Sequence, residues 1–372
     1  MTAVATRLET RRLPRALHPA AWWVWALGLG AAASTTTNPL LLGLVLGTLA
    51  LVVAHRRTDA PWARAFRYYL AVAAVCIAIR VMFRTLFGSG AQASDHVLFR
   101  LPLVHTPHWY AGVQLGGPVS LEGLLAATTD GLRLGTLLCC VGAANVLANP
   151  KRALRVLPGA LYELGMAVVV ALTVAPQLVE SLQRVRRARR LRGGSGGRAR
   201  AVRSVLVPVL EDALDRSLCL AAAMDSRGYG RTGTVSARTR RCTAGLLVAG
   251  MAGLCVGAYG LLDASAPAAL GMPVMLSGAV LCCGGLALGG ARVRRTSYRP
   301  DPWRGPEWVV SGLGVVAATL TIFARGADAA AMNPAFSPLQ WPPLPMVPTL
   351  AVLAAGLAAV VAPPPPGPVI RR

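Results

Sequence analysis

Two arginine-glycine steps near the middle of the chain are the residues with the clearest chemistry. They are Arg192-Gly193 and Arg227-Gly228. The arginine guanidinium is planar, permanently charged and suited to binding carboxylates and carbonyl oxygens through two hydrogen bonds at once. The glycine ends a helix in the left-handed conformation and lets the backbone of another protein come close. The two steps therefore predict sites that dock a partner protein, and not a catalytic centre.

Each step closes a stretch that the sequence predicts to be a helix. The two stretches are Pro176–Arg192 and Pro208–Arg227, and each begins with a proline followed by an early glutamate. These residue types are typical of a helix start, because proline lacks the N–H that would be unpaired there and the helix dipole favours a negative charge. We expect the two helices to be separated by a flexible Gly/Ser linker at 193–197 and a basic patch.

The second helix carries a wide apolar stripe, and the first carries a shorter one. The wide stripe consists of Leu206, Leu210, Ala213, Leu214, Ser217, Leu218, Ala221 and Met224, and the short one of Leu178, Leu182 and Val185. Glu211, Asp212, Asp215 and Arg216 lie opposite the wide stripe. Such faces need a partner surface: the other helix, the membrane-embedded helices or a docked subunit. The alternative is a helix pair lying on anionic lipid, where each arginine contributes about 1 kcal/mol.

The composition indicates an all-α, polytopic membrane protein. The chain has 372 residues, of which 54% are hydrophobic and 14% charged, and its mean hydropathy is +0.52. The formal net charge of +23 is expected when cytoplasmic loops collect arginine. The rival interpretation is a membrane-anchored nucleic-acid-binding protein that uses the arginines of 184–203 on phosphates. That stretch has no interleaved aromatic residues for base stacking, so we expect no nucleic acid among the partners.

Hydropathy predicts about eight membrane spans. They are 19–37, 40–54, 67–87, 121–148, 243–262, 270–290, 308–324 and 346–362. The basic flanks place both termini on the cytoplasmic side of the plasma membrane, and the first two runs form a membrane hairpin instead of a signal peptide. The apolar segment 161–175 is short for a crossing, so we expect a packed helix near the cytoplasmic face.

These spans divide the chain into three predicted regions. Residues 1–160 form an N-terminal membrane region of about four spans, and residues 242–372 form a C-terminal membrane region of about four more. Residues 161–241 lie between them on the cytoplasmic side and hold both Arg-Gly steps. The sequence therefore predicts a membrane platform that presents a helix pair to other proteins.

The order of these features resembles a known family. A helix that ends in Arg-Gly, a basic linker, and a proline-started helix that ends in Ser-Arg-Gly-Tyr-Gly resemble the transmembrane T component of energy-coupling-factor (ECF) transporters, the family that includes the cobalt-transport permease subunit CbiQ. The resemblance also reaches the Asn38-Pro39 break, the helix entry at Pro176 and the Arg-Pro-Asp-Pro-Trp loop that ends at Trp303. It implies a scaffold and coupling subunit of an ECF-type ABC importer for vitamin or transition-metal (cobalt or nickel) uptake.

The same resemblance implies the partners and the roles of the Arg-Gly steps. Arg192 and Arg227 are each expected to dock into a groove on one of two ABC ATPase subunits, and a substrate-binding S component is expected to bind the same scaffold within the lipid bilayer. Family members carry Ala-Arg-Gly at these points. Here Leu191 and Ser226 replace the alanine, so the closeness of helix packing at each tip departs from the family pattern.

Motifs for ATP chemistry or hydrolysis are absent from the sequence. A phosphate-binding loop needs a lysine after G-x-x-x-x-G, and the only lysine, Lys151, follows Asn149-Pro150. No H-E-x-x-H or G-x-S-x-G motif occurs either. We therefore expect a non-catalytic permease subunit with no cofactor of its own, in which partner ATPases bind the ATP.

Four charged residues lie inside apolar runs. Arg80 and Arg84 are one turn apart in the third run, and Asp130 and Arg133 share the fourth. Charged side chains within the membrane usually face the protein interior and pair. We expect Asp130 to pair with Arg80 or Arg84; the alternative is that Arg84 extends toward the outer interface.

The long loop at 88–118 collects potential metal ligands. Asp95, His96, His105 and His108 lie there, and imidazole suits cobalt and nickel. Two prolines make the loop irregular, and the resemblance assigns substrate capture to a separate S component, so we expect an ordinary surface loop and no metal site. The eight cysteines form no C-x-x-C pair, and we expect them to be small buried hydrophobes.

Overall fold

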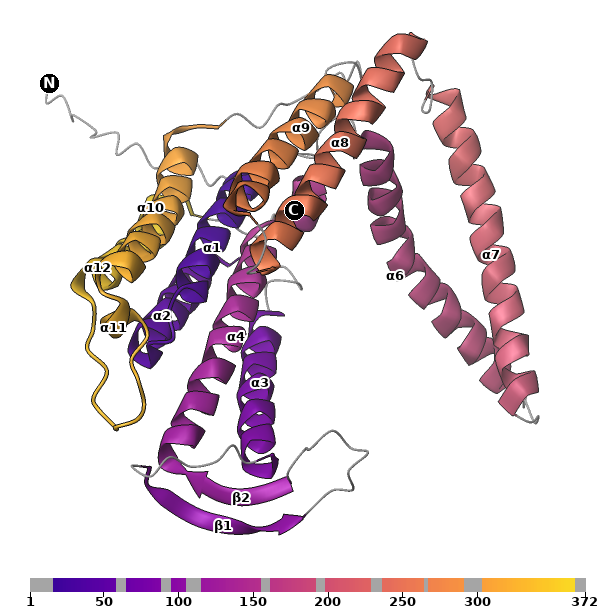
Figure 1. Cartoon of the computed structure of the whole chain (residues 1–372). Helices are drawn as coiled ribbons and strands as arrows, with labels where there is room; N and C mark the ends of the chain where they lie inside the picture. The colour runs from indigo at the N-terminus through magenta and orange to yellow at the C-terminus, as the bar shows by residue number, and fades with distance from the viewer. Residues whose placement is uncertain are drawn as a thin grey trace, which may run out of the picture. The chain divides into compact units, whose positions relative to one another are not determined.

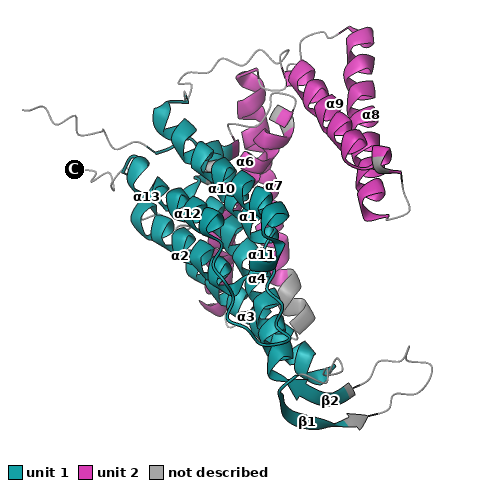
Figure 2. Cartoon of the chain, turned by 60° about the vertical axis from the view of Figure 1, so that its left-hand side comes forward, with its two compact units in different colours: residues 1–153, 300–372 teal, residues 154–299 magenta. Residues whose placement is uncertain are grey.

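The chain folds into helices and one two-stranded sheet (Figure 1). The computed structural model describes residues 16–57, 65–87, 95–104, 115–154, 161–191, 198–228, 236–263, 267–290 and 303–364. The chain forms two compact units, 1–153 with 300–372, and 154–299 (Figure 2). The predicted fold class is confirmed. The units do not follow the three predicted regions, because the segment 242–372 is divided between them.

The first unit combines the two ends of the chain. Its helices are α1 (Pro19–Ser34), α2 (Pro39–Arg56), α3 (Phe66–Leu86), α4 (Leu121–Leu147), α5 (Pro150–Ala153), α10 (Gly305–Ala327), α11 (Ala329–Met332), α12 (Met346–Gly356) and α13 (Ala358–Val361). α1 packs on α4 and α10, and α12 packs on α2 and α10. The C-terminal helices are therefore part of the same core as the N-terminal ones.

Small residues let the helices of this core approach closely. Gly28 of α1 lies against Gly314 of α10, and a Cβ at either position would overlap the backbone of the other helix. Next to this contact Trp25 is fully buried, and its indole Nε1–H donates to the carbonyl of Ala355 at 3.1 Å. In a membrane, where lipid tails are as apolar as leucine, such close packing is what holds helices together.

The Asn38-Pro39 break starts α2, as predicted. The Asn38 side-chain oxygen accepts hydrogen bonds from the backbone N–H of Leu40 at 3.0 Å and Leu41 at 3.4 Å. Its amide nitrogen donates to the carbonyls of Ala331 at 2.9 Å and Pro343 at 2.7 Å. The side chain is fully buried, so one asparagine both caps α2 and ties the α1–α2 turn to the C-terminal segment.

The predicted loop at 88–118 contains regular structure. Strand β1 (Val97–Val104) pairs antiparallel with β2 (Leu115–Ser120), with Phe99 opposite Val119. The interpretation of the whole segment as an irregular loop is therefore wrong. β-branched and aromatic residues in β1 favour a strand, and the pairing is long-range information that a local pattern does not contain.

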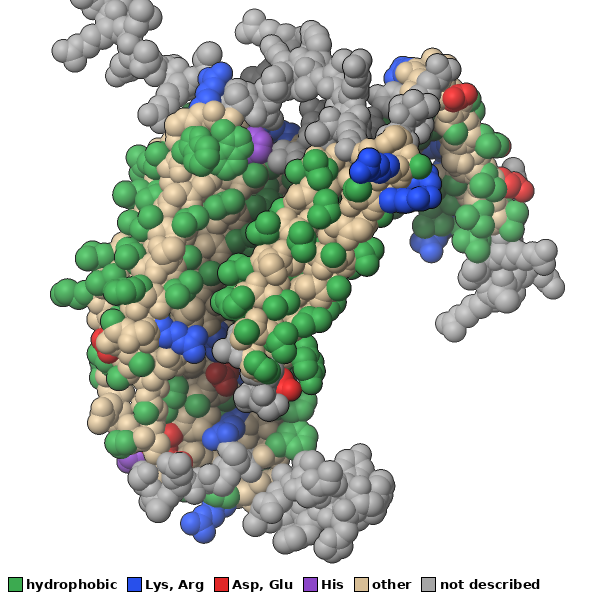
Figure 3. All heavy atoms as spheres, turned by 45° about the horizontal axis from the view of Figure 1, so that its top comes forward, with side chains coloured by type: hydrophobic (Ala, Val, Ile, Leu, Met, Phe, Trp, Pro, Cys, Tyr) green, Lys and Arg blue, Asp and Glu red, His purple; other side chains and the backbone are tan. Residues whose placement is uncertain are grey.

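The described residues of the second unit form two helix pairs. α6 (Tyr162–Leu191) packs on α7 (Arg198–Ser226), and α8 (Ala237–Leu262) packs on α9 (Met272–Gly290), which the short 3-10 helix η4 (Ala268–Leu270) precedes. Hydrophobic side chains cover much of α8, with basic side chains at one end (Figure 3). The arginines in its first two turns are Arg238, Arg240 and Arg241.

Pro176 and Pro208 lie inside α6 and α7 instead of starting them. The predicted helix starts are therefore wrong, and the segment 161–175 is continuous with the arginine-rich segment that follows it. An internal proline removes one backbone hydrogen bond and costs roughly 3 kcal/mol. The helix nevertheless continues for ten or more residues on each side of either proline, and these turns outweigh the single loss.

Among the described residues, seven helices are long and apolar enough to cross a membrane: α2, α3, α4, α6, α8, α9 and α10. This agrees with a multi-pass membrane protein. Six of the eight predicted spans are among them. The other two correspond to α1, with 16 residues, and to the short α12 and α13, while α6 is of spanning length although 161–175 alone was expected not to span.

Candidate coupling site on α6 and α7

The second Arg-Gly step forms an open helix end. The backbone N–H of Arg227 donates to the carbonyl of Met224 at 3.1 Å, and that of Gly228 donates to Asp225 at 2.9 Å. Gly228 has φ +73°, the left-handed conformation that stops a helix. The Arg227 side chain is exposed, and no described residue lies within 4 Å of the place a Cβ on Gly228 would take. The predicted helix stop at Gly228 is confirmed, and the tip is open to another protein.

The first Arg-Gly step is only partly described. α6 ends at Leu191, whose side chain is exposed. Arg192, Gly193 and the rest of the linker to residue 197 lie outside the described residues. The docking role of the first step therefore stays a prediction.

One carboxylate joins the two helices. The Ser181 hydroxyl of α6 donates to Asp212 Oδ2 of α7 at 2.6 Å. Arg216 holds the same carboxylate from one turn further along α7, with Nε at 3.1 Å from Oδ1 and Nη2 at 3.0 Å from Oδ2. The Ser181 hydroxyl, and then the charges of Arg216 and Arg184, lower the pKa of the Asp212 carboxyl. We call Ser181, Asp212 and Arg216 the carboxylate clamp.

The wide apolar stripe of α7 does not pack on α6. Its leucines are 51% to 68% exposed: Leu206, Leu210, Leu214 and Leu218. Val209, which is buried, and Asp212, which bonds Ser181 of α6, lie on a face rotated away from this stripe. A polar residue expected opposite the stripe therefore takes part in the contact. Of the partner surfaces considered for the stripe, the other helix is therefore excluded in the part of the chain that the structure describes.

Comparison with known proteins identifies the family. A family model described as CbiQ, "Cobalt transport protein", matches residues 10–237, which include both Arg-Gly steps and the carboxylate clamp. The chain belongs to the CbiQ cobalt transport protein family. The matched segment ends where α8 begins, so α8 to α13 of this CbiQ-family chain lie almost wholly beyond it.

A named relative agrees with this assignment. The chain is similar to a protein called energy-coupling factor transporter transmembrane protein EcfT from Leuconostoc gelidum subsp. gasicomitatum, with 35% identity over 92 residues. The match covers 23% of this chain and 34% of the relative, which is about a third of that protein's length. The resemblance stated from the Arg-Gly steps is therefore confirmed at the level of the family.

The structure places the four intramembrane charges but does not pair them as expected. Asp130 and Arg80 are exposed, and among the described residues no ion pair joins Asp130 to Arg80 or Arg84. Gly131 faces α3, so the neighbouring Asp130 points about 100° away around the helix. Arg133 instead donates to the backbone carbonyl of Ser34 in α1.

Arg84 lies at the start of α4. A Cβ on Gly123 would sit 2.8 Å from Arg84 Nη2, so the guanidinium packs against the first turn of that helix. Because Gly123 has no side chain, the long side chain of Arg84 fits against this turn. It was not predicted from the sequence, because nothing local to Arg84 indicates which residue of α4 it meets.

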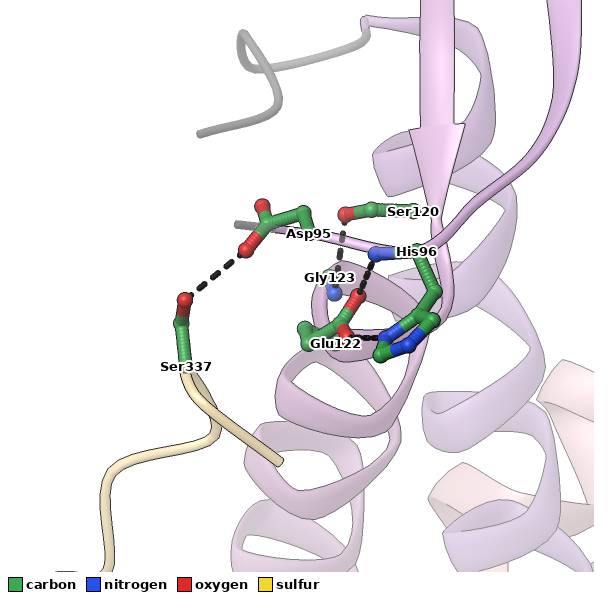
Figure 4. Close-up of polar contacts among 6 residues, drawn as sticks. All are labelled: Asp95, His96, Ser120, Glu122, Gly123 and Ser337. Atoms are coloured by element: carbon green, nitrogen blue, oxygen red, sulfur yellow. Dashed lines mark hydrogen bonds and ion pairs between the residues drawn. The ribbon is translucent and has the colours of Figure 1, made fainter. Parts of the chain in front are cut away.

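The polar residues of the β1–β2 hairpin make contacts at the beginning of α4 (Figure 4). His96 Nδ1 lies 2.6 Å from Oε1 of the buried Glu122, and the His96 backbone N–H donates to Glu122 Oε2 at 3.0 Å. Ser337 donates to Asp95 at 2.8 Å. His105 and His108 lie outside the described residues, and no three His, Cys, Asp or Glu side chains gather as metal ligands within the described ranges.

Proposed function

We propose that this chain is the transmembrane coupling subunit of an ECF-type ABC importer. In this function it joins two ABC ATPase subunits to a substrate-binding S component and passes nucleotide-driven motion between them. The observation that carries the proposal is the tip at Arg227-Gly228, an exposed arginine on a helix that stops in the left-handed conformation, within the segment that matches the CbiQ family. A guanidinium in this position can bind a carboxylate or carbonyl cluster on a partner.

The exposed leucines of α7 support the same proposal. A helix face with four leucines that are each more than half exposed offers a contact surface for a partner. A subunit that binds both ATPases and a membrane-embedded S component requires such surfaces next to its docking tips. The name of the Leuconostoc relative, an ECF transporter transmembrane protein, is consistent with this assembly.

The proposal includes an orientation and a division of labour. The helix tips and both chain termini lie on the cytoplasmic side, in agreement with the basic flanks of the apolar helices. ATP binding and hydrolysis belong to the partner ATPases, and this chain needs no cofactor. The transported substrate is a vitamin or a transition-metal ion such as cobalt or nickel, selected by the S component.

Co-purification tests the proposal. The full chain is expressed with an ABC ATPase pair and a small hydrophobic membrane protein from the same organism, and retention of the ATPases is measured for Arg192→Ala and Arg227→Ala. Each variant loses charge-assisted hydrogen bonds of about 1.5–3 kcal/mol, so we expect ATPase affinity to fall about tenfold to hundredfold. Arg186→Ala, which removes an exposed arginine of α6 outside the motifs, is the matched control and keeps wild-type affinity.

Two results would count against this function. One is wild-type retention and transport in both Arg-Gly variants, given normal membrane insertion. The other is failure of the wild-type chain to retain any ATPase together with tight, salt-dependent DNA binding by the same preparation. The second result would favour the nucleic-acid-binding interpretation of the arginines at 184–203.

A further inference from the structure

The contact between α6 and α7 is unusually thin. Among the described side chains of the two helices, those classed as buried are Ser181 and Val209. Most apolar side chains of α7 point away from α6. The relative placement of two helices of about thirty residues therefore depends on a small central contact, and not on a broad apolar interface.

The carboxylate clamp forms the polar part of this contact. The Asp212 carboxylate accepts from the Ser181 hydroxyl across the interface and from two nitrogens of Arg216 on its own helix. Arg216 fixes the direction of the carboxylate, because a side-on arginine pair leaves little rotational freedom. Ser181 is only 3% exposed, so water does not replace the carboxylate as its acceptor.

Each half of the clamp precedes one of the two Arg-Gly tips along the chain. Ser181 precedes Arg192 by about three helical turns, and Asp212 precedes Arg227 by about four. α6 and α7 are continuous between the clamp and their described ends. A displacement at either tip therefore acts on a rigid arm that is held at Ser181 or Asp212.

We propose that Ser181 and Asp212 are positioning residues that fix how α6 crosses α7 and transmit displacement of one Arg-Gly tip to the other. Transmission rests on the proposed coupling function, whereas positioning is a property of this chain alone. The two parts are therefore tested separately. Neither residue touches ATP or substrate in this role.

The positioning part is tested by a distance measurement on the full chain in nanodiscs without partners. Genetically encoded spin labels replace the exposed residues Arg187 and Leu220, which avoids the native cysteines. We expect a narrow distance distribution for the otherwise unmodified chain and a clearly broader one for Ser181→Ala and Asp212→Asn. Ser181→Thr retains the hydroxyl and is expected to restore the narrow distribution.

Matched controls come from the exposed side of α7. Ser217 donates to the Leu214 carbonyl of its own helix, and Asp215 is exposed. Ser217→Ala and Asp215→Asn are expected to leave the distance distribution unchanged. Wild-type distributions in both clamp variants, or equal broadening in the controls, would overturn the positioning role.

The transmission part is tested in the assembled complex, by counting substrate transported per ATP hydrolysed. We expect Ser181→Ala and Asp212→Asn to retain the ATPases but to lower this ratio about fivefold or more, while the two controls match wild type. A broadened distance distribution with an unchanged ratio would overturn transmission. If the wild-type chain retains no ATPase, the proposed function and transmission both fail, and the distance measurement still decides the positioning role.

Discussion

The two helix pairs of the second unit are held together in opposite ways. α8 and α9 meet through glycines: a Cβ on Gly257 would lie 2.5 Å from the backbone nitrogen of Met275, and one on Gly278 would lie 2.6 Å from that of Leu254. α6 and α7 meet through a buried hydroxyl and a carboxylate held by an arginine. The first contact is backbone against backbone, and the second is made by polar side chains.

The difference follows from the surroundings that each pair suits. Lipid offers no hydrophobic drive for two apolar helices to associate, so a membrane pair depends on close van der Waals packing of small residues. The Asp212 carboxylate is partly exposed, so the α6–α7 contact can use charge-assisted hydrogen bonds instead. We infer that α8–α9 is a fixed pair, whereas the placement of α6 on α7 depends on a few polar side chains.

The largest expected effect is on membrane insertion, and it compares a residue of α8 with a residue of α7. Val248 at the centre of α8 and Leu218 on α7 are both 68% exposed. An arginine at the centre of a membrane helix costs about 2.5–3.5 kcal/mol of insertion free energy, so Val248→Arg is expected to reduce membrane insertion strongly. Leu218→Arg is expected to insert normally and to change the stability of the isolated chain by less than about 0.5 kcal/mol. Glycosylation mapping measures the insertion, and equal insertion of the two variants would contradict the contrast.

A smaller effect is expected from filling the glycine contact. Gly257→Leu places a side chain against the α9 backbone, which cannot move away as a flexible side chain could. We expect a loss of about 1–3 kcal/mol from overpacking, seen as a lower Tm in detergent. Gly284→Leu is the control, because no atom in the described part of the chain lies within 4 Å of the Cβ that would be added there. A Tm for Gly257→Leu as high as that of the control would show that the pair is not fixed.

The smallest effect concerns the pH response of the α6–α7 pair. The Ser181 hydroxyl and then the neighbouring arginines lower the pKa of Asp212 from the ordinary value of 3.8. A lowered pKa contributes stability above the unfolded-state pKa, and this contribution is lost as the pH falls through the folded-state pKa. The distance distribution between α6 and α7 is therefore expected to be constant from pH 7 to pH 5 and to broaden only below about pH 4.

Asp212→Asn is the control for this titration, because its amide does not ionise. Its distance distribution is expected to be broad already at pH 7 and to stay so on acidification. Broadening of the wild-type distribution between pH 7 and pH 5 would assign the response to a group other than Asp212.

Local features of the fold were predictable wherever the deciding energy is local. The hydropathy of the apolar runs predicts most of the helices of spanning length. The Asn38-Pro39 break and the Arg227-Gly228 step predict a helix boundary and a helix stop that the structure confirms. The predicted helix starts at Pro176 and Pro208 are wrong because a proline indicates only its own unfavourable contribution to a helix. The helical turns on both sides of each proline outweigh that contribution.

The sequence by itself determined that this is a helical membrane protein with a family-specific pair of Arg-Gly steps. Hydropathy, helix capping and motif order depend on residues that are close together in the sequence, so they can be read without a structure. Only the tertiary structure decided that Asp212 faces α6, that the leucines of α7 remain exposed, and that Arg133 meets Ser34 and not an aspartate. The face by which a helix packs depends on the shape and charge of a distant segment, and no local pattern contains that information.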